Sequence, residues 1–190
     1  RDWSYQAFNA WANRLAASLA SAGVQRGDVV AVLMENRPEV LALVTAIVKL
    51  GAAAGMLNHQ QRGEVLSHSI GLIKPKAIIV GSECHAAFDS TGLHGGRDGG
   101  PVRFWLGDGA PEGFIDLAVD SHARSSQNPS TTGAVLARDT CFYIFTSGTT
   151  GLPKASRMTH YRWLRGMAGL SQMSMRLKAD DVFYCCLPLY

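Results

Sequence analysis

A nine-residue segment late in the chain concentrates groups that bind phosphate. Its first six residues hold four hydroxyl side chains and two glycines, and a lysine ends it. Glycine lets a backbone approach a ligand closely and adopt positive φ, and successive free N–H groups can surround an anion. The hydroxyls add donors, and the lysine adds a positive charge for polyphosphate oxygens. The residues predicted to act in this way are Thr146, Ser147, Gly148, Thr149, Thr150, Gly151 and Lys154.

This pattern predicts a loop that holds a polyphosphate and neutralises charge as a pyrophosphate leaves. The alternative from composition alone is an ordinary turn rich in serine, threonine and glycine after a strand. The spacing of the residues excludes two other kinds of functional loop. A Walker A loop needs a lysine directly after its last glycine, and this segment has none there. A nucleophile elbow around Ser147 needs glycine where Phe145 stands.

Regular elements on both sides must position this loop. Residues 140–145 are β-branched and aromatic and predict a strand, and a helix is expected from about residue 159 to 173. We expect the neighbouring aromatic side chains to be core residues rather than pocket walls, and His160, at the helix start, to have a structural role. These aromatic residues are Phe142, Tyr143, Phe145 and Trp163.

The preceding chain alternates helices with continuous apolar strands. Ser4 is a plausible N-cap for a first helix, whose apolar residues recur at spacings of three and four up to a stop at Gly23. Strands are expected at residues 29–34, 52–57 and 77–80, with helices from Pro38 to Leu50 and from about residue 62 to 73. Continuous apolar strands suit a sheet covered on both faces. The sequence therefore predicts an α/β fold with a largely parallel sheet flanked by helices.

Two segments depart from this alternation. Residues 90–113 contain eight glycines, seven of them by Gly109, around a short strand at 102–106, and we expect a mobile surface excursion there. Residues 121–133 are rich in Ser, Thr, Asn and Pro and predict a second loop. Neither segment reads as a linker between domains.

Composition limits the classes of function. The 190 residues are 47% hydrophobic and 17% charged, with a formal charge of only +3 and no basic cluster, which excludes a nucleic-acid-binding role. The four cysteines show no C-x-x-C pair and are interpreted as buried free thiols, which indicates a reducing, cytoplasmic location. The apolar run at residues 40–57 is expected to be a buried crossover helix and strand rather than a membrane span.

Other candidate sites are weaker. Gly107-x-Gly109 resembles the start of a dinucleotide fingerprint, but Glu112 stands where its third glycine belongs. The six histidines are dispersed and the cysteines lack the spacing of zinc ligands, so no metal site is predicted.

Residues 143–154 resemble the phosphate loop of the adenylate-forming superfamily, which includes acyl-CoA synthetases, luciferases and peptide-synthetase adenylation domains. The resemblance extends over almost the whole chain except the two loops. Ala155 replaces the glycine that many members have after the loop lysine, and the chain looks most like the branch of fatty-acid transport proteins, very-long-chain acyl-CoA synthetases and FadD-type enzymes. Further matching segments are residues 3–5, 23–30, 35–39, 57–58, 74–77, 180–182 and 185–190.

The resemblance implies a function and an incomplete active site. In this family a carboxylate attacks the α-phosphorus of ATP, pyrophosphate leaves, and a thiol, usually that of coenzyme A, takes the acyl group; Mg²⁺ accompanies the ATP. Residues 146–151 would surround the β and γ phosphates, with Lys154 pairing to them. The family's nucleoside-contacting motifs, hinge and catalytic lysine lie downstream. Residues 1–190 are thus expected to be an incomplete N-terminal, ATP- and acyl-binding domain, without catalytic residues and inactive alone.

The resemblance implies a fatty acid, ATP and coenzyme A as small-molecule partners. It leaves peripheral membrane association and oligomeric state open. A second hypothesis is a non-catalytic module for fatty-acid uptake or binding, or a truncated remnant, that keeps the fold.

Overall fold

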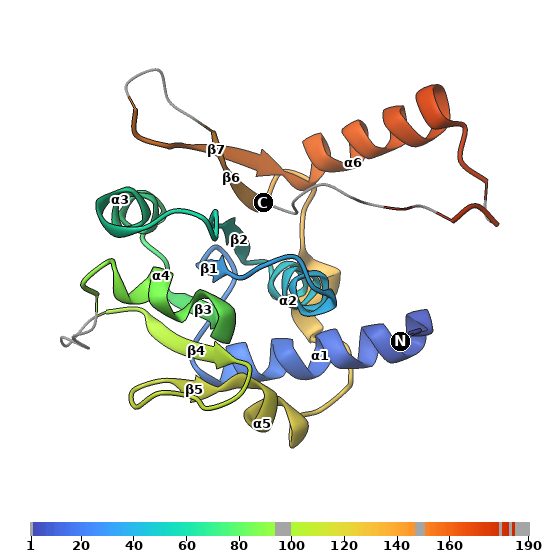
Figure 1. The fold of residues 1–190 in the computed structure, drawn as a ribbon. Coiled ribbons are helices and arrows are strands. Elements are labelled where there is room, and N and C mark those ends of the chain that lie inside the picture. Colours follow the sequence, from blue (N-terminus) through green and yellow to red (C-terminus); the bar gives the residue numbers. More distant parts are fainter. Residues whose placement is uncertain (1, 94–99, 147–150, 179, 183, 185–190) are drawn as a thin grey trace.

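A computed structural model describes residues 2–93, 100–146, 151–178, 180–182 and 184. Its centre is a sheet with the strand order β5-β4-β3-β1-β2-β6-β7, in which only the β6–β7 pair is antiparallel. The predicted α/β fold with a largely parallel sheet is confirmed (Figure 1). The strands are β1 (Val29–Leu33), β2 (Ala53–Met56), β3 (Ala77–Gly81), β4 (Val102–Leu106), β5 (Ile115–Asp116), β6 (Thr140–Thr146) and β7 (Lys154–Thr159).

Helices cover both faces of the sheet (Figure 1). On one face, Val30, Val32 and Phe104 join a core with α1, α2 and α5. On the other face, the alternate residues Leu33 and Ile78 join a core with α3 and α4. The helices are α1 (Tyr5–Ser21), α2 (Pro38–Lys49), α3 (Gly63–Ile73), α4 (His85–Asp89), α5 (Leu117–His122) and α6 (His160–Ala168), with short turns η1 (Ser82–Cys84), η2 (Ser130–Ala134) and the π-helical η3 (Gly169–Met175).

Local sequence signals fix several element ends. The Ser4 hydroxyl accepts a hydrogen bond from the N–H of Ala7 at 3.1 Å, as an N-cap does. Pro38 opens α2 at a position where its missing N–H is not needed. Gly51 follows this helix with a φ of +74°, in the left-handed region that favours glycine.

The apolar run at residues 40–57 is divided between α2 and β2, as expected. Ala42, Ala46, Ile47 and Ala54 are completely buried. Within the described part of the chain, no helix is long and apolar enough to cross a bilayer.

The expectation of a surface excursion over residues 90–113 is wrong for β4. This strand pairs with β3 along its whole length, and Phe104 and Trp105 are buried on opposite faces of the sheet. The Trp105 indole N–H also donates to the carbonyl of Asp108 at 3.1 Å. Sheet pairing and burial therefore outweigh the glycines that flank this strand. Residues 94–99 lie outside the described residues.

Three other expectations need adjustment. The second loop begins later than predicted, because α5 continues to His122, and η2 forms part of it. The strand β7 occupies the residues between the predicted loop and the predicted helix, where no element was expected. The last helix is α-helical only to Ala168 and continues as η3 to Met175.

Candidate functional site

The phosphate-loop candidate is the connection of a β-hairpin. Strand β6 runs parallel to β2, with Met56 opposite Ile144, and then pairs antiparallel with β7. Thr146 and Lys154 are direct partners in this second pairing. The hairpin thus brings together the first hydroxyl residue and the lysine of the predicted set, although eight positions separate them in sequence.

Three of the seven predicted residues can be placed. Thr146 is the last residue of β6, Lys154 is the first of β7, and both are exposed. Gly151 has a φ of +88°, a conformation that side-chain-bearing residues rarely adopt, so a glycine is required at this turn. The other four, Ser147, Gly148, Thr149 and Thr150, lie outside the described residues.

The hairpin connection lies beyond the carboxyl ends of the parallel strands, which we call the carboxyl edge of the sheet. Open α/β sheets bind ligands there. The chain that leads into β7 also contacts a helix, because the imidazole Nε2 of His68 on α3 lies 3.3 Å from the carbonyl oxygen of Pro153. The predicted loop therefore occupies the part of the fold where a ligand is expected.

A polar network that sequence analysis did not anticipate joins three other strands at this edge. Arg37 donates from Nη2 to the carbonyl of Leu106, the last residue of β4, at 2.8 Å. Its Nη1 lies 3.4 Å from the carboxylate of Glu83, which follows β3. Glu83 also accepts a hydrogen bond from the N–H of Glu35, after β1, at 3.0 Å. The network fixes the carboxyl ends of β1, β3 and β4 relative to one another. Its members are 46 to 69 residues apart in the sequence, so no local sequence pattern indicates the network.

His160 lies at the opposite end of β7 from Lys154. The strand spans six residues, so at about 3.4 Å per residue its ends are roughly 17 Å apart. The His160 imidazole Nε2 is buried and has no hydrogen-bond partner in the described residues. Burial lowers the pKa of this imidazole, while the nearby Asp139 carboxylate acts in the opposite direction. This placement agrees with the structural role expected for His160.

The aromatic residues near the hairpin divide into two groups. Tyr143 and Phe145 are partly buried and pack against the core shared with α3, and Phe142 packs against the opposite core. Trp163 packs against Phe142, with ring centroids 5.0 Å apart, yet 42% of it is exposed. The expectation that Trp163 is a core residue is therefore wrong for the described structure.

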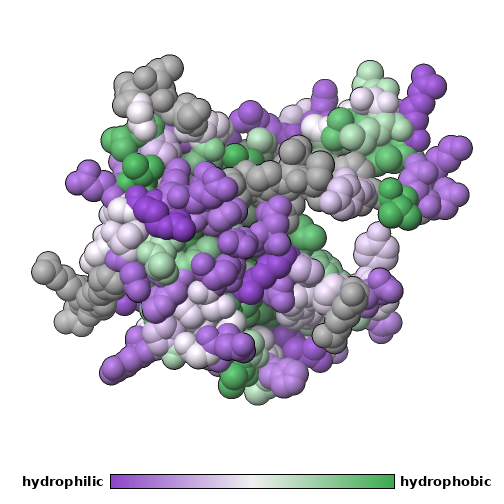
Figure 2. Space-filling view, in the orientation of Figure 1, coloured by the Kyte–Doolittle hydropathy of each residue, from purple (hydrophilic) through white to green (hydrophobic). Residues whose placement is uncertain are grey.

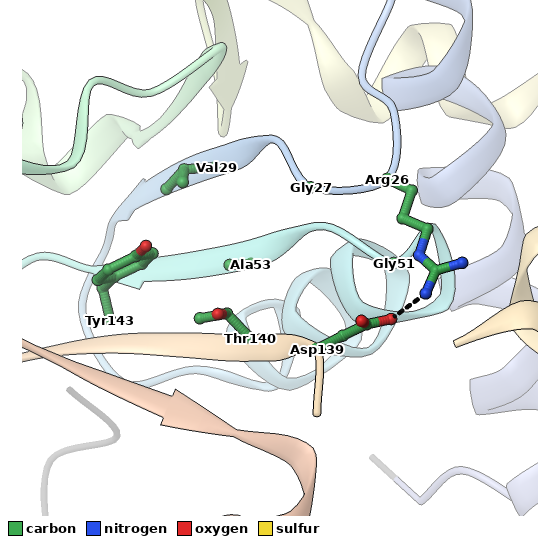
Figure 3. Close-up of a pocket in the computed structure, with 8 residues that line it drawn as sticks. All are labelled: Arg26, Gly27, Val29, Gly51, Ala53, Asp139, Thr140 and Tyr143. Carbon is green, nitrogen blue, oxygen red and sulfur yellow. Dashed lines mark hydrogen bonds and ion pairs between the residues drawn. The ribbon is translucent and has the colours of Figure 1, made fainter. Parts of the chain in front are cut away.

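A pocket of about 230 Å³ lies at the amino ends of the parallel strands, the end of the sheet opposite the phosphate loop (Figure 3). Val29, Ala53 and Thr140, which line it, are the first residues of β1, β2 and β6. An ion pair between Arg26 and Asp139, 2.7 Å long, borders it. The N–H of Leu136 and then Arg26 lower the pKa of the Asp139 carboxyl. Because this pocket opens at the amino ends of the strands, we do not assign it to the phosphate loop.

The two described cysteines are buried free thiols, as expected. Burial raises the pKa of Cys84 to about 11, and the nearby Glu83 and Glu35 carboxylates act in the same direction. Burial also raises the pKa of Cys141 to about 11. Both thiols are therefore protonated near neutral pH and unsuited to nucleophilic chemistry. Cys185 and Cys186 lie outside the described residues.

Comparison with known proteins agrees with the fold. A family model described as AMP-binding enzyme matches residues 1–190. The chain belongs to this family. It is 49% identical over 187 residues to the medium/long-chain-fatty-acid–CoA ligase FadD6 of Mycobacterium tuberculosis (strain ATCC 25618 / H37Rv), covering 98% of this chain and 30% of the relative. It is 37% identical over 195 residues to human long-chain fatty acid transport protein 1, covering 99% of this chain and 29% of that protein.

A solved structure has the same fold. The crystal structure of ATP-bound MatB from Rhodopseudomonas palustris superposes with a TM-score of 0.80 at 27% identity, covering 97% of this chain and 35% of that one. The predicted resemblance to the FadD and fatty-acid transport protein branch is thus confirmed. The chain spans about 30% of the length of these curated relatives.

Proposed function

We propose that the whole protein activates a fatty acid with ATP, and that residues 1–190 are the N-terminal part of the enzyme and carry its phosphate-binding loop. In the proposed reaction the fatty carboxylate attacks the α-phosphorus of ATP, forms an acyl-adenylate and releases pyrophosphate. Coenzyme A then takes the acyl group and releases AMP. The observation that carries this proposal is the hairpin at the carboxyl edge of the sheet, in which Thr146 and Lys154 face each other at the base of the loop.

The chain's own residues would act by positioning and by charge. Lys154 places an ammonium group at the mouth of the loop, where the β and γ phosphates would bind. The backbone N–H groups and hydroxyls of residues 146–151 would surround the same phosphates. Together they would stabilise the charge that develops on pyrophosphate as it leaves, which is how phosphoryl-transfer enzymes achieve most of their catalysis.

Mg²⁺ is part of the proposal and would be held mainly by the nucleotide. The described residues contain no group of three histidine, cysteine or acidic side chains that could hold a metal ion. In nucleotide sites, phosphate oxygens and waters usually supply most of the Mg²⁺ ligands. When bound, Mg²⁺ would neutralise phosphate charge.

Fatty-acid-dependent exchange of labelled pyrophosphate into ATP tests this function in the complete protein. Fatty acids of increasing chain length, with acetate and benzoate as comparison acids, should show exchange that depends on a fatty acid. Formation of acyl-CoA from the best acid should then require added coenzyme A. Binding of fatty acids without exchange for any acid would contradict the ligase and favour an uptake or binding protein, an alternative supported by the relatives that are named fatty acid transport proteins.

A further inference from the structure

The two residues that flank Lys154 are held by the fold, although Lys154 itself is exposed. Pro153 is buried, and its carbonyl oxygen lies 3.3 Å from the imidazole Nε2 of His68 on α3. Ala155 packs against the hydrophobic core that α3 shares with the sheet. The backbone on both sides of the candidate phosphate-binding lysine is therefore held on the side of one helix.

Helix α3 is a firm support for this contact. Its residues Leu66, Ser69 and Ile70 are buried, and the helix packs against both β1 and β7. The Ser69 hydroxyl donates to the side-chain oxygen of Gln61, before the helix, at 2.9 Å. Figure 1 shows α3 beside the hairpin, and Figure 2 shows hydrophobic surface at their junction. The core therefore sets the position from which the His68 side chain reaches the hairpin.

The contact between His68 and Pro153 has a defined direction. A peptide carbonyl oxygen can only accept a hydrogen bond, so His68 donates from Nε2. The neutral imidazole that carries its proton on Nε2 and the imidazolium can both donate in this way. Proline has no N–H of its own, so its carbonyl is the backbone group through which hydrogen bonding can hold this residue. His68 therefore supplies a hold that the pairing of the strands cannot supply through an N–H of Pro153.

The alternation of side chains along the hairpin gives Lys154 a direction. Phe145 and Ala155 are direct partners in the pairing of β6 with β7, and both pack against the core on the α3 side of the sheet. Successive side chains of a strand point to opposite faces. Lys154 and its partner Thr146 therefore point away from α3. A shift of Pro153 relative to α3 would displace the Lys154 side chain with it, because the two residues are adjacent.

We propose that His68 is a positioning residue for Lys154, and that its hydrogen bond to the Pro153 carbonyl holds the start of β7 where the lysine ammonium meets the polyphosphate. The inference rests on the proposed function, because it assigns His68 a role in the release of pyrophosphate. His68 acts through the backbone of Pro153 and needs no contact with the nucleotide. A misplacement of about 1 Å in a positioned group can slow a reaction strongly, so loss of this hold should lower the rate of acid activation.

Hydrogen–deuterium exchange of the complete protein without ligands, resolved by mass spectrometry, tests the hold. His68→Leu removes the N–H donor, His68→Gln keeps one, and His122→Leu is the matched control at an exposed position on α5. In His68→Leu we expect the amides of residues 151–156 to exchange about fivefold faster, the factor that corresponds to one hydrogen bond of ordinary net strength. The other two variants should exchange there at the wild-type rate, and α2 should be unchanged in all four proteins.

Fatty-acid-dependent ATP–pyrophosphate exchange by the same four proteins tests the consequence for the reaction. We expect His68→Leu to lower kcat about tenfold and to change KM for ATP by less than about twofold, because the hold matters most as charge develops on the leaving pyrophosphate. His68→Gln should keep most of the wild-type kcat. A general loss of folding in His68→Leu would instead lower the urea midpoint of the whole protein.

Three outcomes would overturn the proposal. Unchanged deuterium exchange of residues 151–156 in His68→Leu would show that the contact does not hold the hairpin. Faster deuterium exchange with an unchanged kcat would make His68 a structural residue only. Equal acceleration in α2 would show general destabilisation. The deuterium measurement needs neither ATP nor catalysis, so a wild-type protein without pyrophosphate exchange would contradict the proposed function while the hold by His68 is still decided.

Discussion

Two side-chain thiols show how burial controls chemistry at the scale of single residues. Cys84 and Cys141 are buried, and burial raises the pKa of each to about 11. Only the thiolate reacts rapidly with alkylating reagents. At pH 7.5, iodoacetamide should therefore leave both residues unmodified in the native protein and label them in 6 M guanidinium. Peptide mass spectrometry measures each site separately, and native labelling at the unfolded rate would contradict this assignment.

His160 should make stability depend on pH. Burial lowers its pKa in the folded state, whereas in the unfolded state the pKa is about 6.5. In the range below about pH 6.5 the unfolded chain binds more protons than the folded chain, so the free energy of unfolding falls as pH falls. We expect the urea midpoint to decrease between pH 7.5 and 5.5. His160→Gln should reduce this decrease, while the same change at the exposed His122 should not; equal pH dependence in all three proteins would exclude this role for His160.

At the scale of elements, β4 is predicted to be a major part of the core. Phe104 is completely buried between the sheet and the helices α1 and α5. Phe104→Ala should lower the free energy of unfolding by about 3–5 kcal/mol, because it removes apolar contacts and leaves a cavity. Val119→Ala, at an exposed position on α5, should change it by less than about 0.5 kcal/mol. Urea unfolding measures both, and similar values would contradict the place of β4 in the core.

Lys49 holds the long connection between α5 and β6 against the helices. Its ammonium group donates to the side-chain oxygens of Asn9, Asn13 and Asn128 at 2.6, 2.7 and 2.7 Å. Asn13 is only 1% exposed, so Lys49→Met would leave the side-chain oxygen of Asn13 without this donor. We expect the substitution to lower the free energy of unfolding by about 1–3 kcal/mol. We also expect faster proteolysis at residues 124–130. The exposed Lys76→Met is the control, and resistance equal to this control would mean that Lys49 does not hold the connection.

Sequence predicted the elements whose signals are local. The apolar runs of β1 and β3 and the Ser4 cap of α1 depend only on neighbouring residues, and each was correctly placed. The strand at residues 102–106 was correctly placed, but its surroundings were misjudged, because its glycine-rich flanks resemble a surface loop whereas β4 is buried beside β3 in the sheet. Strand β7 was missed because Lys-Ala-Ser-Arg-Met-Thr is weak in strand-forming residues, and its structure depends on pairing with β6.

At the scale of the whole molecule, sequence predicted the composition of the candidate site but not its assembly. The hydroxyls, glycines and Lys154 could be read directly, yet their position on a hairpin at the carboxyl edge required the sheet order. The network of Arg37, Glu83, Glu35 and the carbonyl of Leu106 could not be found in advance, because three separate strands, β1, β3 and β4, bring its members together.

We propose that Lys154 and its loop bind the phosphates of ATP during acid activation. The most direct test is the rate of fatty-acid-dependent ATP–pyrophosphate exchange by the complete protein, comparing wild type with Lys154→Ala, Thr149→Ala and Lys76→Ala. Lys76 is an exposed lysine that directly precedes β3, at the amino ends of the strands and so away from the phosphate loop. We expect Lys154→Ala to lower the exchange rate about a hundredfold, Thr149→Ala to lower it less, and Lys76→Ala to leave it unchanged. Exchange by a folded Lys154→Ala protein at the rate of Lys76→Ala would contradict this proposal.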